Sequence, residues 1–208
     1  MIRVNEQPEP AEFDALVRQP GLLFLAKYPS PTSKDYESPN NYWTNVLFKM
    51  RTAYGWVCAY CCEYIPYGTQ IDHFWPKSKP DYKLAYEWSN YRLACGIVNS
   101  RKGVKTILDP FTIQDGWFRM QFTSLQIVPA PESILPPTVT REQIQYAITE
   151  LKLNDEGEHI PARKKHVIEY CRSGDFQHLT DMAPFIAKEL TRQGYVQTIK
   201  EMMDLQMP

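Results

Sequence analysis

The chain has 208 residues, of which 43% are hydrophobic and five are tryptophan, so it is large and apolar enough to bury a core. Its formal net charge of −1 at pH 7 argues against a protein that binds nucleic acid through a uniformly basic surface. No stretch approaches the roughly 20 apolar residues of a membrane span, and residues 1–13 lack the apolar core of a signal peptide. These features predict a cytoplasmic protein without a membrane partner.

The first 55 residues are expected to form a helical segment. Residues 10–21 predict one short helix that ends at the Pro-Gly pair. Residues 28–41, rich in proline and serine, predict an exposed loop. Residues 42–55 predict a core-facing helix that stops at a glycine, because their apolar side chains recur at helical spacing. Those side chains are Trp43, Val46, Leu47 and Met50.

Beyond the central part of the chain, a hairpin is expected. Residues 117–122 alternate apolar with polar side chains, and residues 125–128 follow a Thr-Ser turn, which predicts two antiparallel strands. Residues 129–138 contain four prolines in a short stretch and predict a linker.

The remainder is expected to be a small helical subdomain. Its first helix follows Thr140 and carries an apolar stripe. The second runs from Pro161 to Tyr170, and the third has Pro184 in its first turn and Gly194 after its end. The stripe consists of Ile144, Ile148 and Leu151, and the tail also contains three histidines expected at the surface (His159, His166 and His178) and one buried thiol (Cys171).

The central segment carries most of the side chains that suggest chemistry. Residues 72–105 hold seven Lys or Arg against three acids, whereas residues 106–208 hold ten against fourteen. A cationic segment inside a mildly acidic protein indicates a focused phosphate site, with a solvated charged face as the alternative. The segment contains, in order, Cys58-x-x-Cys61, Asp72-His73, Asn90, Cys95 and Asn99-x-x-Lys102.

These residue types suit the hydrolysis of a phosphodiester. The reaction needs a nucleophilic water, stabilisation of charge on the phosphate and help for the departing 3′ oxygen, and one hard cation can provide the last two. Mg²⁺ or Mn²⁺ prefers oxygen ligands, which Asp72 and Asn99 offer. His73 can be neutral near pH 7 and accept a proton from the water. Strand neighbours point to opposite faces, so Asp72 and His73 share a site only where the strand ends or twists, as Pro76 allows.

The series resembles the HNH endonuclease family, in the variant with asparagine at the last motif position. The resemblance covers residues 56–105, and the segments DHFWPKS, YEWSNYRLAC and NSRKG are most similar to stand-alone HNH proteins of bacterial anti-phage defence loci, including the nuclease component of Septu-type systems. It implies an α+β fold with a ββα-metal, treble-clef-like core. We then expect a helical segment packed on the core (1–55), the nuclease core with the following hairpin (56–128), and a linker with a C-terminal helical subdomain (129–208).

The resemblance also implies roles. The protein would be a metal-dependent endonuclease, a hydrolase that cleaves nucleic acid, with DNA the favoured substrate. His73 would be the general base, Asp72 and Asn99 the ligands of Mg²⁺ or Mn²⁺, and Asn90 the residue whose amide holds the loop opposite His73. Phosphate contacts are expected from the basic residues of the segment, namely Lys77, Lys79, Arg92, Arg101, Lys102 and Lys105.

The cysteines depart from the family pattern. Many members complete a tetrahedral zinc site with a second Cys-x-x-Cys, but here Val98 stands three residues after Cys95. Either a distorted zinc site forms from Cys58, Cys61, Cys95 and Cys62, although adjacent ligands are awkward, or the thiols pack as small apolar groups.

Two other function classes stay open. A nucleic-acid-binding or scaffold module that keeps the fold without activity is the main alternative. A zinc-binding module acting only on proteins is disfavoured, because complete sets of zinc ligands are scarce in the sequence. The acidic helical tail is expected to dock a partner or a second copy of the chain. The resemblance names an ATPase from the same defence locus as that partner.

Overall fold

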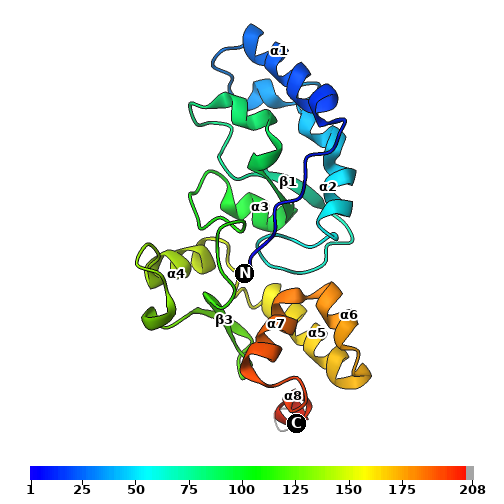
Figure 1. Cartoon of the computed structure of the whole chain (residues 1–208), viewed down its shortest axis with the longest axis vertical. Coiled ribbons are helices and arrows are strands. Elements are labelled where there is room, and N and C mark those ends of the chain that lie inside the picture. The colour runs from blue at the N-terminus through cyan, green and yellow to red at the C-terminus, as the bar shows by residue number, and fades with distance from the viewer. Residues whose placement is uncertain (205–208) are drawn as a thin grey trace. The chain divides into compact units, whose positions relative to one another are not determined.

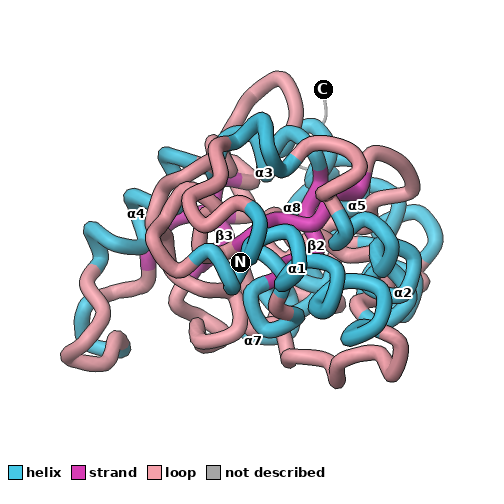
Figure 2. Tube along the Cα trace, turned by 90° about the horizontal axis from the view of Figure 1, so that it is seen from above, coloured by secondary structure: helices cyan, strands magenta, loops and turns pink. Residues whose placement is uncertain are grey.

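The computed structural model describes residues 1–204 (Figure 1). Its α+β class is as expected, with many helices and two separate antiparallel pairs of strands (Figure 2). Strands β1 (Thr69–His73) and β2 (Tyr91–Cys95) form one pair, and β3 (Phe118–Gln121) and β4 (Gln126–Pro129) form the other.

The chain divides into two compact units. The β1–β2 unit comprises Asn5–Cys58 and Ile65–Thr106, and the β3–β4 unit comprises Met1–Val4, Ala59–Tyr64 and the chain from Ile107 onward. These limits differ from the expected boundaries after residues 55 and 128. The N-terminal helices share a unit with β1 and β2, whereas the hairpin of β3 and β4 shares a unit with the C-terminal helices.

Helix α3 (Gly96–Lys102) follows β2 without a loop. In the antiparallel register, Asp72 lies opposite Arg92 and His73 opposite Tyr91, so the end of β1 meets the start of β2. Because α3 begins one residue after β2 ends, it turns back along the pair and contacts both strands. The strand–strand–helix order therefore brings side chains of α3 to the end of β1.

The first helix is longer than the sequence predicts. A π-helical segment (Asp14–Arg18) leads directly into α1 (Gln19–Lys27), so the helix passes through Pro20 and Gly21. Proline has no N–H to donate and fits the first turn of α1, next to a wider π turn in which the Gln19 N–H bonds the Asp14 carbonyl. The expected stop at the Pro-Gly pair is therefore wrong.

Packing explains the glycine at position 21. A Cβ atom there would lie 2.2 Å from Cγ of Tyr86, whose ring is fully buried. Gly21 thus allows α1 to approach Tyr86, which in turn anchors its hydroxyl by donating to the Asn40 carbonyl at 2.9 Å.

Aromatic side chains dominate the core of the β1–β2 unit. Tyr36 is only 3% exposed, so the expected exposed loop around it is partly wrong, and a 3₁₀ turn (Ser33–Tyr36) directs this ring inward. The expected helix after residue 42 is confirmed in outline as a 3₁₀ helix (Tyr42–Val46) followed by α2 (Leu47–Ala53). The core consists of Phe13, Val17, Phe24, Tyr36, Trp43, Val46, Met50, Ile71, Ala85, Tyr86, Trp88, Tyr91 and Leu93.

The β3–β4 unit confirms the expected hairpin and the three expected helices. These helices are α4 (Arg141–Glu150), α5 (His159–Ser173) and α7 (Pro184–Gln193), and the last two end at glycines in left-handed conformation, Gly174 and Gly194. The stripe of α4 is buried, as predicted. Two short helices were not predicted, α6 (Phe176–Met182) and α8 (Ile199–Asp204).

Side chains from outside the hairpin bond its backbone. The Asn154 amide accepts from the Ile127 N–H at 2.7 Å and donates to the Ile127 carbonyl at 2.8 Å. Opposite Ile127, the Met120 N–H donates to the buried Glu189 carboxylate and the Met120 carbonyl accepts from Gln193, both at 2.8 Å. The hairpin is therefore fixed to its helical surroundings by directed hydrogen bonds.

Within residues 1–204, no helix combines the length and the apolar character that crossing a membrane would require.

We predict that Gly21→Ala destabilises the protein. Alanine gains about 1 kcal/mol of helix propensity over glycine. The clash of its Cβ with the buried Tyr86 ring is expected to cost about 1–3 kcal/mol, which outweighs that gain. Urea unfolding measures the difference. Gly157→Ala, where the nearest atom is a flexible Asp155 carboxylate oxygen at 3.3 Å, serves as the control with a change of about 0.5 kcal/mol or less. A Gly21→Ala variant more stable than the parent would contradict the packing argument.

Candidate functional site

A cavity of about 180 Å³ opens at the end of β1, within the β1–β2 unit. Asp72 and His73, the last two residues of the strand, line it together with Asn99 from α3. Pro76 and Lys77 complete this side of the cavity. The structure therefore brings together the three side chains for which a shared site was expected, and β1 does end at His73.

Asp72 is engaged by a buried lysine. Lys102 is fully buried, and its ammonium donates to Oδ1 of Asp72 at 3.0 Å. The same ammonium donates to the carbonyls of His73 at 3.0 Å and Phe74 at 3.2 Å. Lys102 thus neutralises the carboxylate and binds the carbonyls at the point where the strand ends.

His73 is held in one orientation by polar and aromatic neighbours. Its Nε2 lies 3.0 Å from the Ala85 carbonyl oxygen, and the rings of Trp43 and Tyr91 meet it edge-on with centroids at 4.7 and 5.1 Å. A carbonyl can only accept, so Nε2 carries the hydrogen in the neutral ring and Nδ1 keeps its lone pair.

Burial and nearby positive charge determine the protonation state of His73. Desolvation is the main cause that lowers the pKa of His73 to about 3, and Lys77 and Lys102 add to it, against the opposing effect of the Ala85 carbonyl. The imidazole is therefore neutral at pH 7. It can accept a proton, but it is a weaker base than an exposed histidine.

Asn99 lines the same cavity. Its Nδ2 donates to Oε1 of Gln70 at 2.7 Å, which orients the amide and leaves Oδ1 as the acceptor. Gln70 precedes Asp72 by two residues on β1, so the strand itself positions this amide.

Asn90 joins two parts of the loop that follows β1. Its Oδ1 accepts from the Trp75 N–H at 2.7 Å, and its Nδ2 donates to the carbonyls of Trp75 and Leu84 at 3.0 and 2.9 Å. The side chain is buried and does not line the cavity. This geometry agrees with an orienting function rather than with metal ligation.

Two of the expected phosphate contacts do not hold in this structure. Lys102 is buried against Asp72, and Arg92 is 3% exposed and donates to the carbonyls of Ser89 and Tyr91. Neither cation faces solvent. Lys102 neutralises the Asp72 carboxylate near the end of β1, and Arg92 satisfies carbonyls at the start of β2. Lys77, Lys79, Arg101 and Lys105 are partly exposed, and Lys77 also lines the cavity.

Lys77 is the basic side chain best placed to meet an anion. Its ammonium lies 4.0 Å from the centre of the Trp43 ring and 5.5 Å from that of Tyr36. Burial lowers the pKa of Lys77, an effect opposed by the Asp72 carboxylate. The two aromatic faces hold the cation at the cavity wall.

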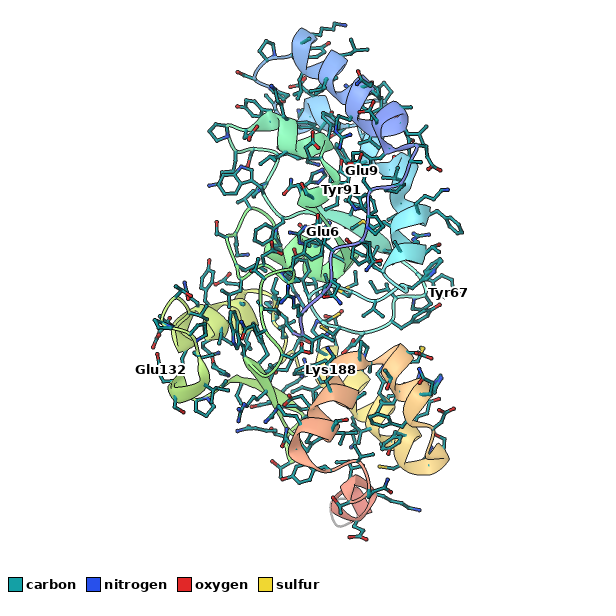
Figure 3. The ribbon with its side chains drawn as sticks, in the orientation of Figure 1. Glu6, Glu9, Tyr67, Tyr91, Glu132 and Lys188 are labelled. Atoms are coloured by element: carbon teal, nitrogen blue, oxygen red, sulfur yellow. The ribbon has the colours of Figure 1, made fainter. Side chains whose placement is uncertain are left out.

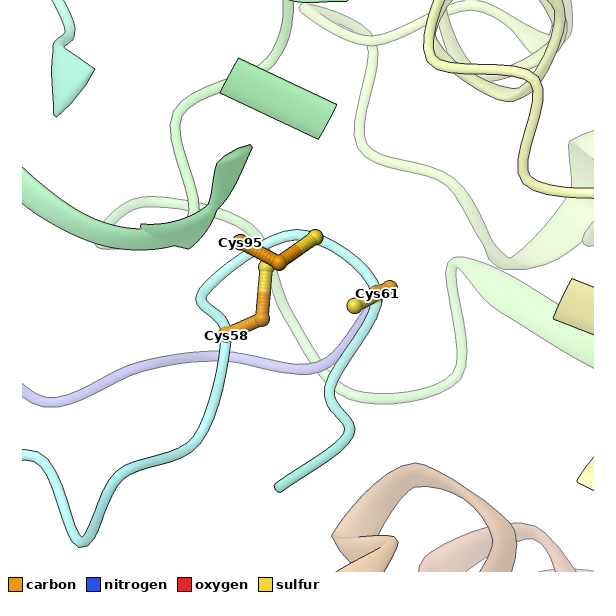
Figure 4. Close-up of side chains that lie close together, drawn as sticks. All are labelled: Cys58, Cys61 and Cys95. Atoms are coloured by element: carbon orange, nitrogen blue, oxygen red, sulfur yellow. The ribbon is translucent and has the colours of Figure 1, made fainter. Parts of the chain in front are cut away.

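None of the five cysteines forms a disulfide; all lie within the described residues. Cys58 and Cys95 belong to the β1–β2 unit, whereas Cys61 belongs to the β3–β4 unit (all three are labelled in Figure 4). The Cys62 thiol donates to the carbonyls of Tyr60 and Ala59, 3.7 and 4.0 Å away. The expected zinc site of Cys58, Cys61, Cys95 and Cys62 combines residues of both units and stays a prediction.

One histidine is buried contrary to expectation. His159, expected at the surface, is 4% exposed, whereas His166 is half-buried and His178 exposed. Cys171, expected to be buried, is half-buried. His159 lies at helical spacing from Arg163, which is buried, and from His166, which is half-buried. This spacing is the signal that could have suggested an inward-facing position for His159.

We predict that Lys102→Met lowers the free energy of unfolding by about 3–5 kcal/mol, because the buried Asp72 carboxylate loses its counter-charge. Lys188→Met is the matched control (Lys188 is labelled in Figure 3), since its ion pair with Asp115 is half exposed on both sides. It is expected to cost about 0–1 kcal/mol in the same urea unfolding experiment. Equal effects of the two substitutions would contradict the assigned importance of the buried pair.

Comparison of this chain with protein-family models, with curated proteins and with solved structures gave no match in any of the three.

Proposed function

We propose that the β1–β2 unit is a metal-dependent phosphodiesterase of the HNH type that cleaves nucleic acid, with DNA as the favoured substrate. The observation that carries the proposal is the convergence of Asp72, His73 and Asn99 on one cavity at the junction of β1, β2 and α3. The strand–strand–helix order supports the proposal, because the ββα-metal core that the resemblance implies has the same order. A carboxylate, an imidazole and an amide at one cavity are the groups that phosphodiester hydrolysis with a hard cation requires.

The side chains present fit a hard divalent cation in donor type. Asp72 and Asn99 offer oxygen atoms to the same cavity, and Mg²⁺ typically takes one or two protein carboxylates and completes its shell with water and substrate phosphate. When bound there, the cation would stabilise charge on the scissile phosphate and on the departing 3′ oxygen.

The positive charge of Lys102 weakens this site. Because the ammonium already compensates Asp72, the carboxylate attracts a second cation less strongly. Phosphate groups of a bound substrate would restore negative charge to the cavity. The proposal therefore includes metal binding that is weak without nucleic acid and stronger with it.

His73 is the proposed general base. The Ala85 carbonyl fixes Nε2 as the protonated nitrogen, so Nδ1 is the atom that can take a proton from water. The edge-on contacts with Trp43 and Tyr91 hold the ring against rotation. Asn90 is a positioning residue, because it ties Trp75 to Leu84, next to the carbonyl that orients His73.

Lys77 supports an anionic substrate. It lines the cavity beside Asp72 and His73, and its stem and charge are held by aromatic faces. Its position allows it to meet a phosphate next to the cleaved bond, whereas Lys79, Arg101 and Lys105 would contact phosphates farther along the strand. A function in anti-phage defence with an ATPase partner rests on the resemblance of the motif residues.

A second candidate is a nucleic-acid-binding or scaffold module without activity. The observation that favours it is the Lys102–Asp72 pair, because a buried lysine occupying the carboxylate can substitute for a cation structurally. The two candidates make different predictions for the same assay.

We predict that the full-length protein cleaves supercoiled plasmid DNA in the presence of Mg²⁺ or Mn²⁺ and that His73→Ala slows cleavage by about 10²–10⁴-fold, the usual contribution of a general base. Initial rates of nicking or linearisation, followed on agarose gels across metal concentrations, give the measurement. His178→Ala removes an exposed histidine of the other unit and should leave the rate unchanged.

Retarded DNA mobility without cleavage, in parent and variant alike, would support the inactive module. Cleavage by His73→Ala at the rate of the parent protein would exclude His73 as the base. Cleavage that persists in excess chelator would exclude the role given to Asp72 and Asn99.

A further inference from the structure

Three metal-ligating side chains gather in the β3–β4 unit, apart from the cavity described above. The sulfur of Cys61, a carboxylate oxygen of Glu63 and a ring nitrogen of His159 lie within 4.8 Å of one another. Cys61 and Glu63 belong to the segment Ala59–Tyr64, and His159 is the first residue of α5. Residues about 100 positions apart thus meet inside one unit, and Asp72, His73 and Asn99 belong to the other unit.

Two polar atoms of this group, one on Glu63 and one on His159, lack hydrogen-bond partners. Cys61 and His159 are each 4% exposed, and the Glu63 side chain is 15% exposed. His159 Nε2 and Glu63 Oε1 are shielded from solvent and make no hydrogen bond. His159 Nδ1 and Glu63 Oε2 lie 3.8 Å apart, too far for a hydrogen bond. Each buried polar atom without a partner costs about 1–3 kcal/mol, so a ligand that binds either side chain would recover part of this cost.

We propose that Cys61, Glu63 and His159 bind one divalent transition metal of the zinc class. Thiolate, imidazole and carboxylate are the three ligand types that zinc takes in proteins, and a soft thiolate with an imidazole disfavours Mg²⁺ and Ca²⁺. Binding replaces the thiol proton of Cys61, which leaves to solvent, with a metal–sulfur bond. A water molecule completes the four ligands. This proposal does not depend on the nuclease proposal.

The site differs from the zinc knuckle that the sequence suggested. It uses one cysteine of the Cys58-x-x-Cys61 pair together with a carboxylate and a histidine from outside that motif. Because Cys61 belongs also to the zinc knuckle expected from the sequence, the contribution of His159 distinguishes the two ligand sets.

The positive charge of a buried guanidinium, that of Arg163, partly opposes metal binding. Arg163 lies one turn after His159. Burial lowers the pKa of Arg163, whereas the Glu63 carboxylate and the thiols of Cys61 and Cys62 act in the opposite direction. Its N–H groups, however, donate to the carbonyls of Leu125 and Leu153 and to Oδ1 of Asn154. These Arg163 hydrogen bonds go to acceptors outside the proposed ligand group, and the guanidinium charge lowers the metal affinity.

The depth of the group indicates a structural function for the metal. With two of its three side chains 4% exposed, the group has no room for a substrate. The metal would link the segment Ala59–Tyr64 to the start of α5. A hydrogen bond from the Tyr64 N–H to the Met182 carbonyl already links this segment to α6. Metal binding would thus stabilise the β3–β4 unit.

Titration of the reduced, chelator-stripped full-length protein with Co²⁺ tests the proposal, because thiolate-bound tetrahedral Co²⁺ gives a charge-transfer band and visible d–d bands. We expect one Co²⁺ per chain, displaced by Zn²⁺. His159→Ala should weaken binding by about 100-fold or more, since even partners outside the ligand shell contribute about 10–100-fold. His178→Ala, Cys58→Ser and Cys95→Ser should leave the affinity unchanged. His159→Cys should retain the metal with a stronger charge-transfer band.

Several outcomes would overturn the assignment. One is the absence of any thiolate–cobalt band, which would mean that water alone satisfies the polar atoms. A second is full affinity in His159→Ala with loss in Cys58→Ser, which would place the metal on the cysteines. Loss in both variants would also contradict a site made of these three residues. Circular dichroism of each apo variant separates loss of a ligand from loss of folding, and retention of metal by His159→Cys provides support even where His159→Ala does not fold.

Discussion

The buried ammonium of Lys102 is the interaction on which the candidate site depends. It binds the Asp72 carboxylate and the carbonyls of His73 and Phe74, so one group joins α3 to the residues where β1 ends. In a two-stranded sheet, the last carbonyls of a strand have few backbone partners, and an unsatisfied carbonyl inside a protein is costly. Lys102 satisfies two of them and balances the adjacent charge. The positions of Asp72 and His73 therefore follow from a residue that does not line the cavity.

Desolvation is the second constraint on the site. The same aromatic core that orients His73 keeps its imidazole neutral, and it also holds Lys77 at the wall of the cavity. Orientation is thus obtained at the expense of basicity. In the proposed hydrolytic site, a bound cation would be needed to make water acidic enough for so weak a base.

Local signals in the sequence predict the elements that local physics determines. The alternation at 117–122 predicts β3, and Gly174 and Gly194 predict the ends of α5 and α7, because their left-handed conformation favours glycine. The positions of Asp72, His73 and Asn99 at one cavity were also expected, since the order of strand, strand and helix limits where these residues can lie.

Features that depend on distant contacts could not be predicted. The residue at position 21 of this helix is glycine because Tyr86, far along the chain, leaves no room for a Cβ atom. The sequence places Lys102 on the same helix face as Asn99, but it does not reveal that the ammonium turns inward to Asp72. His159 is buried because its helix start faces Glu63 and Cys61, which are distant in sequence. In each case the partner, and not the residue itself, decides the environment.

The hydrogen bonds around the β3–β4 hairpin have a consequence for self-association. A two-stranded hairpin has two open edges, and each could recruit a strand from another molecule and begin an ordered aggregate. Asn154 occupies both backbone groups of Ile127 on one edge, and Glu189 and Gln193 occupy both groups of Met120 on the other. Strand addition at these central positions would first have to break those bonds. Any second copy or partner is thereby directed toward side chains instead of the hairpin backbone.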